Sequence, residues 1–334
     1  MKIITLFNNK GGVGKTTLAY HLANMLAGVG YSTLAVDLDP QANLTTSFFE
    51  EEFLEEIWDG SSGDKTVYDA VLPIQEGTGD IALSYPLEVN ENLHVVCGDL
   101  RLSLFEDKLS SVWPYCYQGS DIGALRATTA FYRIIRESGQ KVDAEIAIVD
   151  VGPNLGAINR ATLLASEYLV VPLTADIFSL QGLRNLGSTL VMWRKNWQTI
   201  CENNPGVDFQ IPSGTMEPLG YVIHQQAVRL DRPVKAYERW LEKIPLEYDR
   251  SVLKNNKLFG SAPQSDPNCL ATLRHYRSLI PLAQEAHKPV FDLKPADGVF
   301  GGHVNLVNQS KREFEDLVRA IVERIGIEIV SPLL

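Results

Sequence analysis

Short apolar runs and amphipathic stretches alternate along the chain from its first residues. Residues 3–7 form an apolar run, and residues 18–27 place apolar side chains at 18, 19, 22, 23, 26 and 27. That second spacing is typical of a helix with one buried face. Gly28 and Gly30 then end the helix, and residues 31–36 have the pattern of a second buried strand. The order predicts a β-α-β unit.

The same alternation continues further along the chain. Four more apolar runs have the length of strands buried on both faces of a parallel sheet: 93–97, 146–149, 168–172 and 219–223. We expect further helices at 67–73, where Pro73 should stop the helix, at 124–137 and at 311–325. Strands alternating with helices predict a doubly wound α/β fold, with helices on both faces of a mostly parallel sheet.

Length and composition limit what the chain can be. Its 334 residues, 45% of them hydrophobic, suffice for a large core, and we expect one domain over residues 1–334. No run of eighteen apolar residues occurs and the chain enters a strand at once, so we expect no membrane span and no cleavable signal, and a cytoplasmic location. The four cysteines are widely separated, which argues against a disulfide framework or a zinc knuckle.

Charge is unevenly distributed. The net charge is −11, and residues 1–150 hold 10 Lys and Arg against 22 Asp and Glu. Acidic residues concentrate at 48–59, where they mix with large apolar residues. This mixture is typical of an exposed amphipathic helix or a docking segment, but we favour the simpler interpretation, a solvated face that covers one edge of the core. The overall acidity disfavours a protein that coats DNA indiscriminately, while a local basic surface could still bind phosphates.

The segment between the first strand and the first helix has the composition of a phosphate-binding loop. Three glycines let the backbone approach a polyphosphate, Lys15 can reach its terminal phosphates, and Thr16 can bind Mg²⁺. The loop residues expected at the nucleotide are Lys10, Gly11, Gly12, Val13, Gly14, Lys15, Thr16 and Thr17. Asn9 stands where the usual motif has its first glycine, and Lys10 is an additional lysine.

Carboxylates follow two of the predicted strands. Asp150 ends the run at 146–149, and we expect it near the magnesium ion beside Thr16, although an aspartate there could also cap a helix. Asp37 and Asp39 follow the second strand, which we expect to lie beside the first. We expect Asp39 to orient the attacking water, whereas Asp37 either supports the site or serves as a structural turn residue.

Three further sequence blocks accompany the loop: VDLDPQAN at 36–43, VDVGPNLG at 149–156 and VPLTADIFSLQGL at 171–183. With KGGVGKTT at 10–17 they resemble, in order, the motifs of the ParA/MinD ATPases, which carry a deviant Walker A loop, and above all those of its ParA-type partition members. The resemblance implies a P-loop NTPase fold, ATP and Mg²⁺ as cofactors, weak intrinsic ATP hydrolysis, and a homodimer formed in the ATP state. It also implies that Lys10 acts on the nucleotide of the partner subunit.

The same resemblance extends to the partners and the remaining site residues. A weaker match at 281–291 implies that Pro281 and Leu282 lie near the adenine. An activator or cargo-adaptor protein is implied, and a role in DNA partition or chromosome segregation with the protein associated with the nucleoid. The chain is longer than compact members, with the extra length near 48–64, 107–121 and 197–217, the last of which we expect to be rich in loops. Its C-terminal residues lack the basic amphipathic helix of a membrane binder.

A basic stretch at 229–257 is the candidate surface for nonspecific DNA. The candidate residues are Arg229, Arg232, Lys235 and Arg239. Spacings of three and four place Arg232, Lys235 and Arg239 on one helical face. Solvated helix charge explains such a stretch about equally well.

Two other functions remain open at this point. The chain could be a regulatory module that uses ATP to choose between monomer and dimer with little turnover, and that contacts a protein through residues 48–59. It could also be a metabolic enzyme on the same loop, but the absence of a cysteine pair argues against a reductase, and Lys10 with the block at 36–43 argues against a synthetase.

Overall fold

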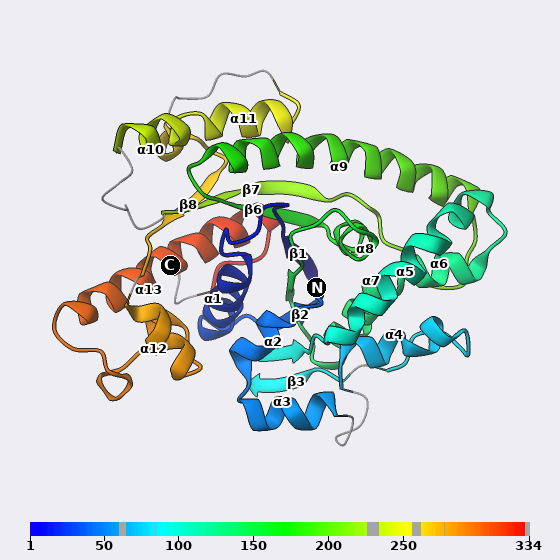
Figure 1. Cartoon of the computed structure of the whole chain (residues 1–334), viewed down its shortest axis with the longest axis horizontal. Coiled ribbons are helices and arrows are strands. Elements are labelled where there is room, and N and C mark those ends of the chain that lie inside the picture. Colours follow the sequence, from blue (N-terminus) through cyan, green and yellow to red (C-terminus); the bar gives the residue numbers. More distant parts are fainter. Residues whose placement is uncertain (60–64, 84, 226–233, 256–261, 277, 331–334) are drawn as a thin grey trace.

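The structure is a computed structural model that describes residues 1–59, 65–83, 85–225, 234–255, 262–276 and 278–330. Within these residues the backbone forms an eight-stranded sheet in the order β3-β4-β2-β5-β1-β6-β7-β8 (Figure 1). Only the β3–β4 pair is antiparallel among the described strands. The strands are β1 (Lys2–Leu6), β2 (Thr33–Asp37), β3 (Leu87–Asn90), β4 (Leu93–Val96), β5 (Ile146–Asp150), β6 (Tyr168–Leu173), β7 (Glu217–His224) and β8 (Cys269–Leu273).

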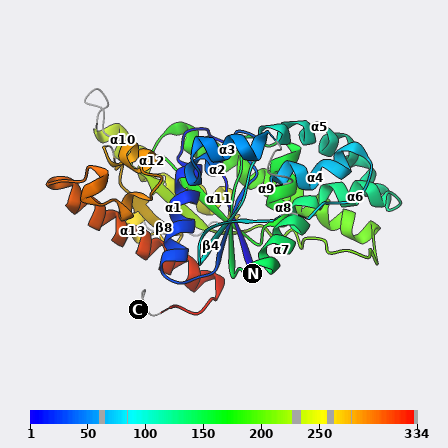
Figure 2. The same cartoon turned by 90° about the horizontal axis from the view of Figure 1, so that it is seen from below.

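Helices cover both faces of this sheet, as the view from below shows (Figure 2). One core lies under α1 (Lys15–Gly28), α2 (Asn43–Phe48), α3 (Glu51–Trp58), α12 (Leu279–Glu285) and α13 (Gly302–Ile325). The other lies under α4 (Val67–Glu76), α5 (Ser103–Val112), α6 (Ile122–Thr128), α7 (Ala130–Lys141), α8 (Ala157–Ala165), α9 (Ile177–Asn203) and α11 (Ile244–Ser251). The predicted doubly wound α/β fold is confirmed.

Shorter elements complete the described chain. Helix α10 spans Val234–Leu241, and the 3₁₀ turns are η1 (Leu100–Leu102), η2 (Trp113–Gln118), η3 (Pro263–Ser265), η4 (Val290–Asp292) and η5 (Pro295–Asp297). The sequence GSSGD at 60–64, whose glycines and serines predict a flexible connector, lies outside the described residues.

We expected the second strand to lie beside the first, and this prediction was wrong. Strand β5 lies between β1 and β2, with Leu6 and Asp37 both paired in register with Asp150. The acids nevertheless reach one edge, because all three strands are parallel and their carboxyl ends coincide. The insertion places Asp150 at the centre of this edge, between the phosphate loop and Asp37.

Several predicted helix boundaries were also wrong. Pro73 does not stop its helix: α4 continues to Glu76 and ends at Gly77, whose φ of 72° is left-handed. The helix expected at 124–137 is two helices that meet at Thr129, whose φ of −102° and ψ of 2° lie outside the helical region.

The two late segments differ from expectation in extent. Helix α9 continues through Trp197 to Asn203, so the expected loop at 197–217 is helical in its first part. Its aromatic face explains this, because Trp193 and Trp197 are buried in the core. Helix α13 begins at Gly302, ahead of the expected residue 311.

Candidate nucleotide site

The loop between β1 and α1 adopts a conformation that requires glycine. Gly12 and Gly14 have φ angles of 71° and 82°, in the left-handed region where other residues are strained. A Cβ atom on Gly14 would lie 3.1 Å from Nδ1 of His224. Helix α1 begins at Lys15, immediately after Gly14, so its unpaired N–H groups face the loop. This geometry fits the backbone cradle of a polyphosphate.

A hydroxyl and a carboxylate meet beside the loop. Thr16 Oγ1 donates to Asp150 Oδ2 at 2.6 Å, while Oδ1 of Asp150 is buried and has no hydrogen-bond partner among the described residues. Burial, with a smaller effect from the Asp37 charge, raises the pKa of Asp150 to about 8. A buried carboxylate oxygen without a partner beside a threonine hydroxyl fits one side of a magnesium site, since Mg²⁺ uses few protein oxygens and takes others from water and phosphate.

Lys15 is buried next to this pair. Burial lowers its pKa, an effect opposed by the charges of Asp150 and Asp39. No ion pair within the described chain engages its ammonium group. Lys15 is therefore a poorly solvated cation at the mouth of the cradle, where an anionic ligand would gain most from it.

The two aspartates at the end of β2, Asp37 within it and Asp39 after it, differ in their surroundings. Asp37 is buried, and both its oxygens accept bonds from its own chain: Oδ2 from the Thr45 N–H and hydroxyl, each at 2.8 Å, and Oδ1 from the Asp39 N–H at 3.2 Å. Burial raises its pKa to about 6. These contacts favour the structural interpretation of Asp37.

Asp39 faces the loop that follows β5. Its Oδ1 accepts from the Gln41 N–H at 3.0 Å, and a Cβ atom on Gly152 would lie 3.4 Å from that oxygen. Asp39 thus lies between its own turn at Gln41 and the loop at Gly152. This placement is compatible with positioning a water there, and that role stays a prediction.

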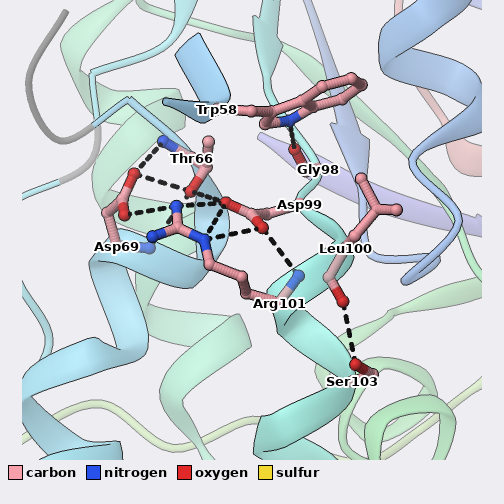
Figure 3. Close-up of polar contacts among 8 residues, drawn as sticks. All are labelled: Trp58, Thr66, Asp69, Gly98, Asp99, Leu100, Arg101 and Ser103. Carbon is pink, nitrogen blue, oxygen red and sulfur yellow. Dashed lines mark hydrogen bonds and ion pairs between the residues drawn. The ribbon is translucent and has the colours of Figure 1, made fainter. Parts of the chain in front are cut away.

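A polar network behind β2 was missed from the sequence. The Gly98 N–H donates to Thr45 Oγ1 at 2.8 Å, and a Cβ atom on Gly98 would lie 2.8 Å from Cγ of Asp37. The Gly98 carbonyl accepts from the Trp58 indole at 3.1 Å, which ties α3 to the end of β4 (Figure 3). The glycine directly after the run at 93–97 was the available signal.

The same network continues into α4. Arg101 pairs with Asp99 and bonds to Asp69 at 3.0 Å, and these acids raise the pKa of the guanidinium (Figure 3). Thr66 caps α4 and bonds to Asp99 at 2.9 Å. The acidic segment at 48–59 is joined to this region by the Trp58–Gly98 hydrogen bond. Its helix α3 is amphipathic as expected, with Leu54 and Ile57 buried and its glutamates exposed.

The loop after Asp150 is held from two sides. The Asn159 amide donates to the carbonyls of Gly152 and Asn154 at 2.8 and 2.7 Å. Glu106, on α5, accepts from the N–H groups of Ala157 and Ile158 at the start of α8. Asn154 itself accepts from the Gly156 N–H at 2.8 Å, so this asparagine fixes the turn.

The additional lysine contacts two residues that follow β6. Lys10 Nζ donates to Thr174 Oγ1 at 2.8 Å and forms an ion pair with Asp176, both at the end of β6. Burial would raise the pKa of Asp176, but bonds from Lys10 and Thr174 hold it below its ordinary value. The sequence block at 171–183 contained Asp176, yet no role was predicted for it.

A cavity of about 560 Å³ adjoins the loop. Its lining includes Gly14, His224 and Tyr276, from three separate elements. Burial lowers the pKa of His224 to about 4, and its Nε2 has no partner among the described residues. Neither Pro281 nor Leu282 lines this cavity, although the adjacent Ile280 does, so their contact with adenine stays a prediction.

His21 lies on the wall of the same cavity. Its Nδ1 donates to the Thr17 carbonyl at 2.7 Å and its Nε2 accepts from the Val290 N–H at 3.0 Å. This pattern needs the neutral ring, and burial lowers its pKa to about 4. The ring stacks on Phe314 with centroids 5.1 Å apart, so α1 is joined to α13 at the site.

The candidate DNA surface falls largely outside the description. Arg229 and Arg232 are not among the described residues, and only the backbone of Lys235 is placed, in α10. Arg239 is exposed and its guanidinium lies 5.5 Å from the Trp240 ring centroid. The shared basic face therefore stays a prediction.

The match to a known protein family includes the phosphate loop, Asp39 and Asp150. The model of the family described as an AAA domain matches residues 1–202. The chain is 33% identical over 192 residues to the chromosome partitioning protein ParA of Myxococcus xanthus, a match that spans 57% of this chain and 58% of that protein. It is 28% identical over 199 residues to the sporulation initiation inhibitor protein Soj of Bacillus subtilis, spanning 59% and 68%.

A solved structure extends the likeness over the whole length. The ATP complex of a single-residue variant of Cyanothece McdA superposes with a TM-score of 0.62 at 17% identity, covering 98% of each chain. At this identity the likeness supports the fold alone. Among the described helices, none has the length and apolarity to cross a bilayer.

Proposed function

Because the chain belongs to the ParA/MinD-type P-loop ATPases, we propose that it dimerises on binding ATP and hydrolyses ATP to drive the partitioning or positioning of DNA or another cargo. The observation that carries this proposal is the meeting at one sheet edge of the glycine loop, the Thr16–Asp150 pair and a second lysine. The partition proteins among its relatives support the cellular role.

In this proposal the chain's own residues divide the work. The N–H groups of residues 11–16 and Lys15 hold the polyphosphate, and Thr16 with Asp150 would hold Mg²⁺, which supplies charge neutralisation at the phosphates when bound. Asp39 orients the attacking water. Lys10 moves to the nucleotide of the second subunit, so that dimerisation depends on the terminal phosphate.

The raised pKa of Asp150 also fits a cation-dependent site. Near pH 7 a carboxyl group with a pKa of about 8 is mostly protonated, so its proton would be released when a divalent cation arrives. The ionised Asp150 would then supply a negative charge to the cation, which the neutral acid does not. We therefore expect the divalent cation to bind more tightly as pH rises from 7 to 8.

The test of dimerisation uses Lys10→Ala with ATP and Mg²⁺ on a sizing column with light scattering. We expect normal ATP binding and no dimer, because the cation that neutralises the second nucleotide is absent. Lys195→Ala, an exposed lysine on α9, is the matched control and should dimerise as the wild type does. A Lys10→Ala protein that dimerises normally would remove the role across the interface.

Turnover and partners need separate measurements. An activator or cargo-adaptor protein is part of the proposal, and phosphate release with and without candidate partners separates an ATPase from a regulatory module with little turnover. Binding to nonspecific duplex DNA is tested by a salt-dependent mobility shift with ATP. Loss of that shift on changing Arg239 and Lys235 to alanine would support the basic stretch, and no shift at low salt would exclude it.

A further inference from the structure

The ammonium group of Lys10 is already engaged within its own subunit. Its Nζ donates to Thr174 Oγ1 at 2.8 Å and pairs with Asp176 Oδ2. Both side chains are largely shielded, with exposed fractions of 22% for Lys10 and 16% for Asp176. Shielding strengthens such a pair relative to one on the open surface. Lys10 must give up this interaction before it can move to another anion.

The anion that holds Lys10 is rigidly built. Asp176 caps the 27-residue helix α9, with Oδ1 accepting from the Ser179 N–H at 2.9 Å. Thr174 Oγ1 donates to the other oxygen, Oδ2, at 2.6 Å. Asp176 therefore cannot follow Lys10 when the lysine moves, because its two oxygens are fixed by the helix start and by β6.

Close packing fixes this anion relative to the phosphate loop. A Cβ atom on Gly182, in the second turn of α9, would lie 2.9 Å from Oδ1 of both Asn8 and Asn9. The loop residues before Lys10 thus rest directly on α9. Contacts within one subunit therefore fix both partners of the ion pair, Lys10 and Asp176.

We propose that Asp176 is a positioning residue that holds Lys10 within its own subunit and competes for it with the ATP of the second subunit. This inference rests on the proposed function, because it takes Lys10 to act across the dimer. Competition between two anions lowers the net gain from dimerisation. It also favours ATP over ADP, since the nucleotide with more negative charge displaces the carboxylate more readily.

The test is Asp176→Asn, which keeps the size of the side chain and an oxygen able to cap α9, but removes the charge. At saturating ATP and Mg²⁺ we expect half-maximal dimerisation at about tenfold lower protein concentration, measured by sedimentation velocity. Dimers should also become detectable with ADP. Asp316→Asn removes the carboxylate of an exposed ion pair with Arg319 on α13, and this control should change nothing.

A second readout does not depend on dimerisation. In nucleotide-free protein, acetylation of Lys10 by an amine-reactive ester, followed by mass spectrometry, should be several times faster in Asp176→Asn than in the wild type. Acetylation of Lys195 should not change. A purely structural role for Asp176 would instead lower Tm and leave the Lys10 rate as it was.

The outcomes separate this inference from the proposed function. If the wild type dimerises with ATP and Asp176→Asn needs the same protein concentration, the competition is excluded while the proposed function stands. If the wild type does not dimerise with ATP, both fail, whatever the labelling rate. The double variant Lys10→Ala, Asp176→Asn should behave as Lys10→Ala alone, and any gain in dimerisation over it would contradict the inference.

Discussion

The two ends of the phosphate loop carry lysines in opposite electrostatic situations. Lys15 is buried, with a lowered pKa and no ion pair within the described chain, whereas Lys10 is partly exposed and paired with Asp176. One cation is left for a ligand that enters the cradle. The other is held by its own subunit until a better anion arrives. A single loop can in this way bind a nucleotide through Lys15 and respond to a second anion through Lys10.

Removing the Lys15 end should have the largest effect. Lys15→Ala deletes a charge-assisted contact to the phosphates in a poorly solvated site, and we expect ATP affinity to fall about 100-fold in a titration with a fluorescent ATP analogue. Lys10→Ala should bind the same analogue within a few-fold of the wild type. Equal losses in the two variants would show that both lysines serve one nucleotide, and the contrast would disappear.

Asp39→Ala should leave both lysines in place and stop the reaction. The loss of the group that orients the water should slow phosphate release by about 100-fold or more, while ATP still forms the dimer. The dimer should then persist for longer than that of the wild type in a size-exclusion chase with excess ADP. Full turnover in this variant would assign the water to another residue.

Gly182→Ala should disturb the Lys10 end selectively. The added methyl group would lie 2.9 Å from the Asn8 and Asn9 side chains, so the residues before Lys10 must shift while the cradle at Gly12–Lys15 is untouched. We expect ATP-dependent dimerisation to weaken about tenfold with ATP affinity unchanged. Gly302→Ala, where a Cβ atom meets nothing within 4 Å, is the control. A parallel loss of ATP affinity would mean that the loop moves as one unit.

As pH falls, the helix that begins at Lys15 should lose stability before the Lys10–Asp176 ion pair is broken. His21 lies on the helix that Lys15 begins, and its pKa falls from an ordinary 6.5 to about 4 on folding. The folded state therefore binds fewer protons at His21 than the unfolded state. The neutral ring contributes fully to the free energy of unfolding above pH 6.5, and this contribution is lost as pH falls toward 4. The Asp176 carboxylate stays charged over this range because its pKa lies below the ordinary value.

Urea unfolding measures this effect. Between about pH 7 and pH 5, the His21 contribution to the free energy of unfolding should fall by roughly 2 kcal/mol. His21→Gln should lose that part of the pH dependence, whereas His303→Gln, a half-exposed control, should keep it. Identical pH profiles for the wild type and His21→Gln would contradict the burial of a neutral ring.

The sequence predicted what is encoded locally. The glycines and lysines of 10–17 are contiguous, and Asp39 and Asp150 end apolar runs, so each was found from its own segment. The shared edge of parallel strands was correctly expected even though β5 separates β1 from β2, and its Asp150 lies 134 positions from Thr16. Strand order depends on packing between distant segments, which no local pattern specifies.

What was missed consists of contacts between distant residues. Asp176 meets Lys10 across 166 positions, and the Trp58–Gly98 bond joins a helix to the end of a strand 40 positions away. In both cases the residue type was visible, and its partner was decided by the fold. The helix end predicted at Pro73 was a separate and local error, because the left-handed Gly77 ends α4 one turn later.

The most direct test of the account mixes two inactive variants. Lys15→Ala keeps Lys10 but binds ATP poorly, and Lys10→Ala binds ATP but cannot supply the crossing cation. If Lys10 acts on the nucleotide of the opposite subunit, the mixture should regain ATP-dependent dimers and phosphate release that neither variant shows alone. If Lys10 acts only within its own subunit, the mixture should remain as inactive as its components.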